Sequence, residues 1–290
     1  MLRIALPKGS LGDQTLELFS QADLTIKKGD REYNVTIDDP RIGKVKILRP
    51  QEIPTYVEED FFDMGISGSD CVKECGADVV KVAELPYAKT GAGTIKMVIA
   101  VANTESINKP EEIRPGSRVT TEFPNCTKEY FDKLGVPVKI FYSHGASEAK
   151  IPELMDVVVD LTETGATLVK NELKIIGMVG EFPTLLIANK KAWADPKKRR
   201  AIEEIKMLLL GVIEARGRVL LLMNVSKDKL EAVLAALPAM KRPTIYSLTD
   251  DNYVEVTTVV DKRGVNILLP VLKAAGAEDI LEMPISKIVK

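Results

Sequence analysis

Long apolar runs are missing from this sequence of 290 residues. A helix that spans a bilayer needs roughly 18–20 consecutive apolar residues, and the longest candidate here, Lys206–Ile213, is far too short. The opening MLRIALPKGS does not predict a cleavable signal peptide either, because it turns into Pro-Lys-Gly after six residues. We therefore expect no membrane partner.

Cysteine and histidine are also scarce. Three cysteines, an odd number, argue against a secreted disulfide framework and favour a reducing cytoplasm. Cys71 and Cys75 stand four residues apart and could face one metal, but no second Cys/His pair completes a zinc site, so a structural role is expected. The single histidine, His144, leaves no Ser-His-Asp arrangement, and we interpret it as a loop or packing residue.

An excess of charge of either sign is absent too. Forty Lys+Arg against 42 Asp+Glu leave a net charge of −2, which argues against nucleic acid as the main partner. Hydrophobic residues make up 45% and charged residues 28%, as in an ordinary globular protein with a core. The length predicts two domains, with room for a small third. The basic run Lys197–Arg200 is expected to be solvated or to lie between subunits.

Short apolar runs alternate with amphipathic stretches, which predicts an α/β protein. Three predicted strands are each followed by a short loop and a helix; they are Leu2–Leu6, Lys44–Leu48 and Asp63–Ser67. The loops after them contain Lys8, Arg49 and Asp70. Ligands of open α/β sheets bind beyond the carboxyl ends of the strands, so these three residues are candidates for a site.

A second group of strands follows. The candidates are Met97–Val101, Arg118–Thr121, Val138–Phe141 and Val157–Val159, and Thr184–Ala188 is expected to return to the first group. Two crossings of the chain predict two lobes around a cleft, a natural place for a small-molecule site. We expect lobe I at residues 1–90 with 183–208, and lobe II at residues 91–182.

The last part of the chain predicts a separate unit from about residue 212, after a long helix over Lys197–Gly217. Its expected elements, in order, are the strand Arg218–Val225, the helix Lys227–Leu237, the strands Thr244–Leu248 and Tyr253–Val260, the helix Val265–Ala275 and the strand Asp279–Ile285. This βαββαβ order is that of a ferredoxin-like unit.

The most informative motif is MDVVVDLTETGATL, from Met155 to Leu168. Three valines predict a strand buried on both faces, and a loop rich in threonine and glycine follows. Backbone N–H groups and hydroxyls of such a loop can hold a phosphate, and Gly165 allows close approach or a positive φ. Asp160 suits a neighbouring ribose. The alternative is a loop that merely caps a helix.

Two better-known phosphate motifs are absent. No Gly-Lys-Ser/Thr follows the loop, and no G-x-G-x-x-G stands between a strand and a helix. A sugar-phosphate loop therefore remains as the functional interpretation.

The run DVVVDLTETGATL, with HGASE shortly upstream, resembles the signature of the ATP phosphoribosyltransferase family, the first enzyme of histidine biosynthesis. The segments RIALPKGSL, ILRPQEIP, DMGISGSD and TEFPN stand in the expected order, and RPTIYSL with LKAAGAEDILEMPI resembles the regulatory domain of the long form. The resemblance implies a two-lobed catalytic core like that of periplasmic binding proteins, followed by a ferredoxin-like regulatory domain.

It also implies a reaction, in which N1 of ATP displaces pyrophosphate from phosphoribosyl pyrophosphate (PRPP) with the help of Mg²⁺. Lys8, Arg49 and Asp70 are the expected catalytic residues. The PRPP site is expected to comprise Glu148, Asp160, Thr162, Glu163, Thr164, Gly165, Ala166 and Thr167. Mg²⁺ is expected to bind mainly through the substrate phosphates, and the chain to form a homo-oligomer, from dimer to hexamer.

The resemblance further implies inhibition by histidine, bound to the last unit at a subunit interface. The residues expected there are Asn224, Thr244 and, in the turn Gly276–Asp279, Ala277, Glu278 and Asp279. The alternative for this turn is a plain helix C-cap at Gly276.

Two rival functions involve no catalysis, namely a solute-binding receptor and an amino-acid-sensing regulator. The expected absence of a signal peptide argues against the first. The second would be expected to contain a DNA-binding helix-turn-helix, and no N-terminal candidate for one exists.

Overall fold

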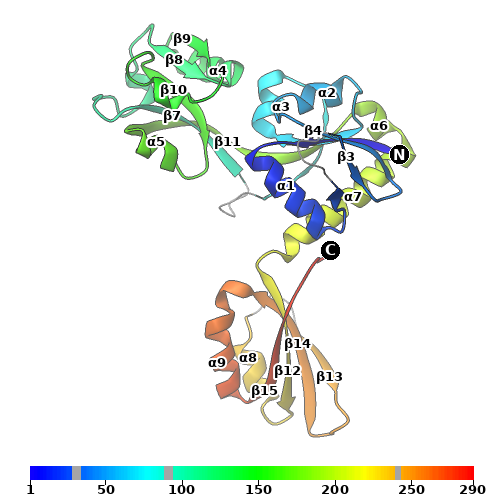
Figure 1. Cartoon of the computed structure of the whole chain (residues 1–290). Helices are drawn as coiled ribbons and strands as arrows, with labels where there is room; N and C mark the ends of the chain where they lie inside the picture. The colour runs from blue at the N-terminus through cyan, green and yellow to red at the C-terminus, as the bar shows by residue number, and fades with distance from the viewer. Residues whose placement is uncertain (28–33, 88–93, 239–242) are drawn as a thin grey trace. The chain divides into compact units, whose positions relative to one another are not determined.

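The computed structural model describes residues 1–27, 34–87, 94–238 and 243–290. The chain forms two compact units, Met1–Lys206 (unit 1) and Met207–Lys290 (unit 2) (Figure 1). The lobe boundary expected at residues 90 and 91 lies outside the described residues.

The first half of unit 1, which we call lobe I, is built on β1, whose neighbours β4 and β5 run parallel to it. The strands, in sheet order, are β2 (Ile26–Lys27), β3 (Asn34–Ile37), β4 (Ile42–Leu48), β1 (Leu2–Pro7), β5 (Met64–Gly68) and β11 (Leu173–Ala188), with β6 (Val80–Glu84) also on β11. The helices are α1 (Ser10–Gln21), α2 (Ile53–Glu58), α3 (Ser69–Cys75) and α6 (Lys190–Ala194). The three predicted strand–loop–helix units are confirmed, while β2, β3 and β6 were not predicted.

The other half of unit 1, lobe II, continues the sheet beyond β11. Its strands, in sheet order, are β7 (Thr94–Ala102), β10 (Val157–Thr162), β8 (Arg118–Thr121) and β9 (Lys139–Tyr142). Its helices are α4 (Pro124–Leu134), α5 (Ala166–Lys170) and the 3₁₀ turns Pro110–Glu112 and Glu148–Lys150. All four predicted strands are confirmed, and the three valines of β10 are fully buried, as a strand covered on both faces requires.

One strand, β11, belongs to both lobes. It pairs with β7 from Leu173 to Pro183 and with β5 from Thr184 to Ala188. This strand was predicted to begin at Thr184, because glycines such as Gly177 and Gly180 typically interrupt a strand. The prediction was wrong, since the strand begins at Leu173. In the fold the two glycines mark two register shifts, and a Cβ on Gly177 would lie 2.4 Å from Cγ of Pro110. Glycine is therefore needed there for packing.

An ion network around the buried Asp63 links β1, the start of β5 and α7 (Pro196–Ala215). The Asp63 side chain is fully buried and accepts hydrogen bonds from Nη2 and Nε of Arg3, at 2.9 and 3.2 Å, and from Nζ of Lys198 at 2.8 Å. Burial would raise the pKa of Asp63, but its bonds to Arg3 and Lys198 outweigh this and hold that pKa below its usual value. The network is structural, because it lies at the start of β5, opposite the end that carries the candidate loops.

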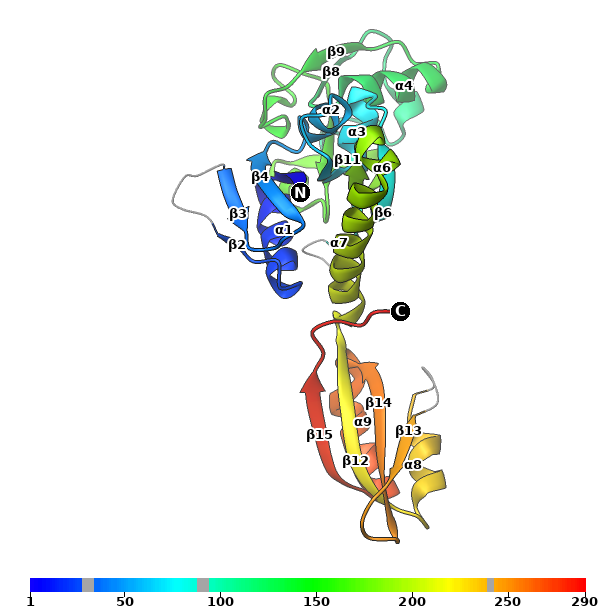
Figure 2. The same ribbon diagram turned by 90° about the vertical axis from the view of Figure 1, so that its right-hand side faces the viewer.

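Unit 2 begins within the last turns of α7 (Pro196–Ala215). The remaining elements are β12 (Arg218–Ser226), α8 (Leu230–Ala236), β13 (Thr244–Ser247), β14 (Tyr253–Asp261), a 3₁₀ turn at Lys262–Gly264, α9 (Val265–Ala275) and β15 (Ala277–Pro284). The antiparallel sheet has the order β13-β14-β12-β15, and alternate residues of β12 and β14 pack against α8 and α9 (Figure 2). The predicted βαββαβ unit is confirmed. In the described part of the chain, no helix is both long and apolar enough to cross a membrane.

Candidate functional site

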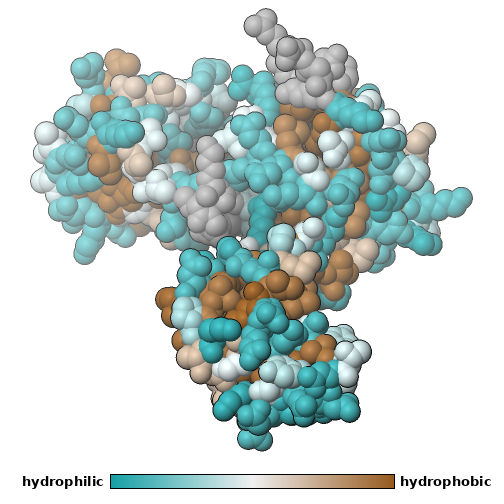
Figure 3. Space-filling view, turned by 60° about the horizontal axis from the view of Figure 1, so that its bottom comes forward, coloured by the Kyte–Doolittle hydropathy of each residue, from teal (hydrophilic) through white to brown (hydrophobic). Residues whose placement is uncertain are grey.

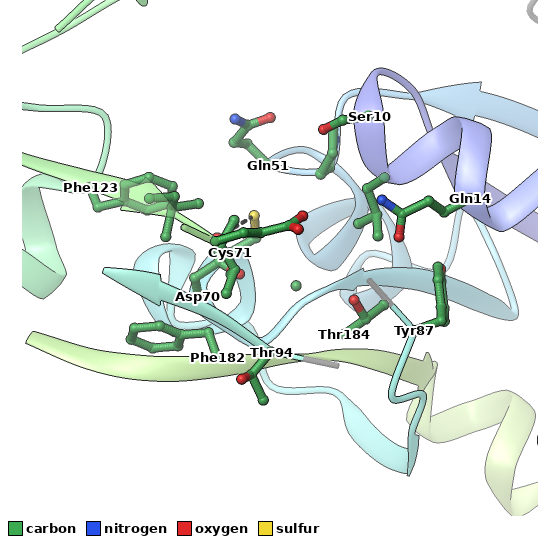
Figure 4. A pocket seen from close by; sticks show the side chains of 16 residues that line it. Ser10, Gln14, Gln51, Asp70, Cys71, Tyr87, Thr94, Phe123, Phe182 and Thr184 are labelled. Atoms are coloured by element: carbon green, nitrogen blue, oxygen red, sulfur yellow. Dashed lines mark hydrogen bonds between the residues drawn. The ribbon is translucent and has the colours of Figure 1, made fainter. Parts of the chain in front are cut away.

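A cavity of about 220 Å³ lies in unit 1 where strand ends of lobe I face lobe II (Figure 4). Its polar wall includes Ser10 and Asp70, from the first turns of the helices that follow β1 and β5, and Gln51, from the loop after β4. Lobe II contributes Glu163 and a set of apolar side chains, which are Ile95, Phe123, Leu161 and Phe182. The geometry suits a ligand with a flat apolar part and polar edges.

Asp70 stands at the start of α3, where the residue is 3% exposed. Burial raises the pKa of Asp70, although hydrogen bonds from the Cys71 thiol and from backbone N–H groups oppose the rise. The carboxyl group folds back over Gly68, on which a Cβ would lie 2.0 Å from Oδ1 of Asp70. A residue without a side chain is therefore needed at position 68 for Asp70 to stay where it is.

The two basic candidates lie beside this wall, not in it. Lys8 follows β1, and its backbone N–H donates to the carbonyl of Leu48 at 2.8 Å, which joins the loops after β1 and β4. Arg49 directly precedes the lining residues Pro50 and Gln51. Neither Lys8 nor Arg49 is among the described residues that line the cavity.

The threonine-rich loop adjoins the cavity through Glu163. Its hydroxyls satisfy its own backbone, since the Gly165 N–H donates to Thr162 Oγ1 at 2.7 Å and the Ala166 N–H donates to Thr164 Oγ1 at 3.3 Å. Gly165 has a φ of 77°, so the positive φ, one of the two roles that the sequence allowed for it, is present. The helix α5 begins at Ala166, so Ala166 and Thr167, which were expected in the loop, belong to the first turn of α5.

Asp160 lies inside β10, which extends to Thr162, and not at the end of a strand as predicted. Its carboxylate accepts a hydrogen bond from Ser147, a buried residue, and another from the Leu161 N–H at 2.7 Å. Burial raises the pKa of Asp160, the Ser147 bond lowers it, and the negative charge of Glu148 raises it further. Glu148 therefore lies close enough to Asp160 for its charge to act on the Asp160 carboxyl group.

Glu122, Ser147 and Lys150 were missed as site residues. The pKa of Glu122 is raised by burial and by the charge of Asp160, while Arg49 and Lys150 oppose the rise. Glu122 is thus close enough to Asp160 of its own lobe and to Arg49 of lobe I for both charges to act on its pKa. Its signal was available, because Glu122 directly follows the predicted strand Arg118–Thr121 as Arg49 follows Lys44–Leu48. Ser147 and Lys150 stand near Glu148 in the sequence, but no comparable sequence pattern marks them as site residues.

The residues expected to bind histidine are only partly together in unit 2. The Asn224 side chain donates to Asp279 Oδ2 at 3.1 Å, and Asn224 stands opposite Glu278 in the β12–β15 register. Ala277, Glu278 and Asp279 were expected in a turn but begin β15, because Gly276, with a φ of 106°, already completes the turn. Thr244 lies on the edge strand β13, with β14 between it and β12.

Comparison with known proteins covers the whole chain. Residues 49–211 match the family described as ATP phosphoribosyltransferase, and residues 215–287 match the one described as HisG, C-terminal domain. An ATP phosphoribosyltransferase of Pelotomaculum thermopropionicum is 44% identical over 288 residues, 99% of each chain. Another, of Solibacter usitatus, is 45% identical over 289 residues, which cover this chain completely and 99% of the relative.

Among solved structures, a chain of the ATP phosphoribosyl transferase (HisG:HisZ) complex from Thermotoga maritima is similar, with a TM-score of 0.62 and 26% identity. The match covers 74% of this chain and 99% of that one.

Proposed function

The chain belongs to the ATP phosphoribosyltransferase family, and from that premise we propose that it joins ATP to PRPP, forming N1-(5-phosphoribosyl)-ATP and releasing pyrophosphate. The family makes it a transferase of histidine biosynthesis. One observation supports the proposal most strongly: the threonine-rich loop of lobe II and the strand ends of lobe I border the same cavity. Two substrates can therefore meet there without a covalent intermediate.

PRPP is assigned to lobe II. Its 5-phosphate would bind the loop over residues 162–167, where it would replace the hydroxyls of Thr162 and Thr164 as acceptors of the loop N–H groups. Asp160 and Glu148 would accept hydrogen bonds from the ribose hydroxyls. Ionised carboxylates are the stronger acceptors, so the Ser147 bond that lowers the pKa of Asp160 favours binding.

Lobe I would supply the catalytic groups. Lys8 and Arg49 stand at neighbouring strand ends, from which their positive charges would stabilise the pyrophosphate as it leaves C1. Asp70 is assigned to the adenine side of the cavity. Burial raises the pKa of Asp70, and its carboxyl oxygens can accept hydrogen bonds on that side.

The acidic groups fit a substrate-bound Mg²⁺ ion. Within the described residues no three His, Cys, Asp or Glu side chains gather as a metal site. Asp70 and Glu163, the two carboxyl groups on the cavity wall, match the usual pattern of one or two carboxylates plus substrate phosphates. The ion would neutralise charge on the departing pyrophosphate.

Unit 2 is proposed to bind histidine as a feedback inhibitor. The Asn224–Asp279 pair offers an amide and a carboxylate to a ligand with an ammonium and a carboxylate group. Large apolar side chains are exposed on β13, β15 and α9, namely Ile245, Tyr246, Leu281, Met283, Ile267 and Val271, and Figure 3 shows brown areas on this unit. They favour a homo-oligomer.

Two assays test the proposal. Mixing the full chain with ATP, PRPP and Mg²⁺ should yield pyrophosphate and phosphoribosyl-ATP in equal amounts. Binding of either substrate without any product would instead support the non-catalytic receptor.

Removing residues from 212 onward, or replacing Asn224 with alanine, should relieve inhibition by histidine. Full inhibition in both variants would place the effector elsewhere.

A further inference from the structure

The two lobes touch at a second place, between α3 of lobe I and α4 of lobe II. The carboxylate of Glu74 accepts the backbone N–H of Asn125 through Oε1, at 2.8 Å, and that of Cys126 through Oε2, at 2.9 Å. The Asn125 side chain donates in return to the carbonyl oxygen of Glu74 at 2.8 Å. Lys73 forms an ion pair with Glu129 at 2.9 Å. We call these five residues the latch.

Glu74 caps the N-terminus of α4, which has no capping side chain of its own. The first N–H groups of a helix have no partner within it, and a Ser, Thr, Asp or Asn before the helix normally accepts one of them. In α4 that position is held by Phe123, whose side chain accepts nothing. A carboxylate from the other lobe takes its place, and its charge is favourable at the positive end of the helix dipole. The cap of α4 therefore depends on how far apart the lobes are.

The latch and the cavity share their supporting elements. The first turn of α3 contains Asp70, which lines the cavity, and its last turn contains the latch residues Lys73 and Glu74. On the facing lobe, Phe123 lines the cavity directly before α4 begins. Moving α3 away from α4 would therefore move Asp70 away from Phe123.

We infer that Glu74 is a positioning residue, which holds the lobes at the separation at which both cavity walls contact the substrates. The inference rests on the proposed transferase function. If the lobes separate more often, a smaller fraction of the molecules is able to bind the substrates. The apparent affinity for the substrates then falls in proportion to that fraction. Substrates that bridge the cleft restore the arrangement once they saturate it. Loss of the latch should therefore raise KM and leave kcat nearly unchanged.

The first test replaces Glu74 in the full chain. Glu74→Ala should raise KM for both ATP and PRPP about tenfold, equivalent to about 1.4 kcal/mol, with kcat within about twofold of wild type. Glu74→Gln should fall between, because one amide oxygen can still accept one N–H. The matched control is Asp132→Ala, which removes a carboxylate of α4 whose ion pair, with Lys128, stays within the helix. It should leave both KM values unchanged.

A second test reverses the ion pair. Lys73→Glu places two negative charges opposite each other and should raise both KM values, and adding Glu129→Lys should restore them. Recovery in the double variant is expected only if the contact between the lobes matters, because each single change alters a half-exposed side chain. A further increase of KM in the double variant would contradict the inference.

Amide hydrogen exchange gives a readout that does not depend on activity. Asn125 and Cys126 should exchange faster in Glu74→Ala than in Asp132→Ala, and equal rates would overturn the latch. Unchanged KM values in Glu74→Ala, or a parallel loss of kcat and melting temperature, would overturn the positioning role. A wild-type chain that makes no phosphoribosyl-ATP would refute the proposed function instead, and exchange alone would then decide on the latch.

Discussion

Replacing Gly68 with alanine should disturb the site through a single contact. The backbone at Gly68 is extended, with φ −70° and ψ 148°, so alanine fits the backbone without strain. Its Cβ, however, would lie 2.0 Å from Oδ1 and 3.0 Å from Cγ of Asp70. Ordinary van der Waals contact begins at 3.4 Å, so the Asp70 carboxyl group must turn away and lose its hydrogen bond to the Cys71 thiol.

The cost can be worked out from these contacts. Loss of hydrogen bonds by a buried carboxyl group costs about 1.5–3 kcal/mol, while Gly→Ala lowers the entropy of the unfolded chain and returns about 0.4–1 kcal/mol. Gly68→Ala should therefore destabilise unit 1 by about 1–2 kcal/mol and lower kcat/KM. Gly264→Ala is the control, because that glycine has a negative φ and no atom within 4 Å of a built Cβ.

A double-mutant cycle isolates the contact. In an Asp70→Ala background the clash partner is gone, so Gly68→Ala should be neutral or slightly stabilising, which makes the coupling energy about 2 kcal/mol. Urea unfolding can be followed by fluorescence of Trp193, the single tryptophan of the chain, which lies in unit 1. Equal destabilisation with and without the Asp70 carboxylate would refute the reasoning.

Three further predictions concern other parts of unit 1. Gly165→Val should lower the free energy of unfolding by about 1–3 kcal/mol, because a β-branched residue is strained at a φ of 77°. Titration calorimetry of this variant should show no PRPP binding. Normal binding would mean that the loop does not belong to the PRPP site. Asp63→Asn should lower the free energy of unfolding of unit 1 by about 2–3 kcal/mol at neutral pH. This is less than the full cost of breaking a buried ion pair, because the side chains of Arg3 and Lys198 are one-third exposed. The folded pKa of Asp63 is lowered, so this stability is present above the unfolded pKa of 3.8 and is lost as pH falls through the folded pKa; a difference that persists in acid melts would contradict the assignment. Ser147→Ala removes a bond that lowers the pKa of Asp160, so the acidic limb of the kcat/KM profile should shift to higher pH; an unmoved limb would mean that Asp160 need not be ionised.

Local patterns in the sequence were sufficient for much of this protein. Three consecutive valines predicted the buried strand β10, and the glycine within TETGAT predicted the left-handed turn at Gly165. Lys8, Arg49 and Asp70 were found as candidates from the strand–loop–helix order alone, and Asp70 lines the cavity. Each of these features depends on the conformation of a few neighbouring residues, and side-chain type and periodicity report on that directly.

Other features were decided only by the tertiary structure. Leu173–Pro183 is a strand because β7 offers it a partner, despite two glycines. The charge of Arg49 acts on Glu122 only because the two lobes meet, and Glu74 caps a helix that begins fifty residues later in the chain. These contacts join residues far apart in sequence, so no local propensity encodes them. They form only when tertiary packing brings distant charges and backbone groups close together.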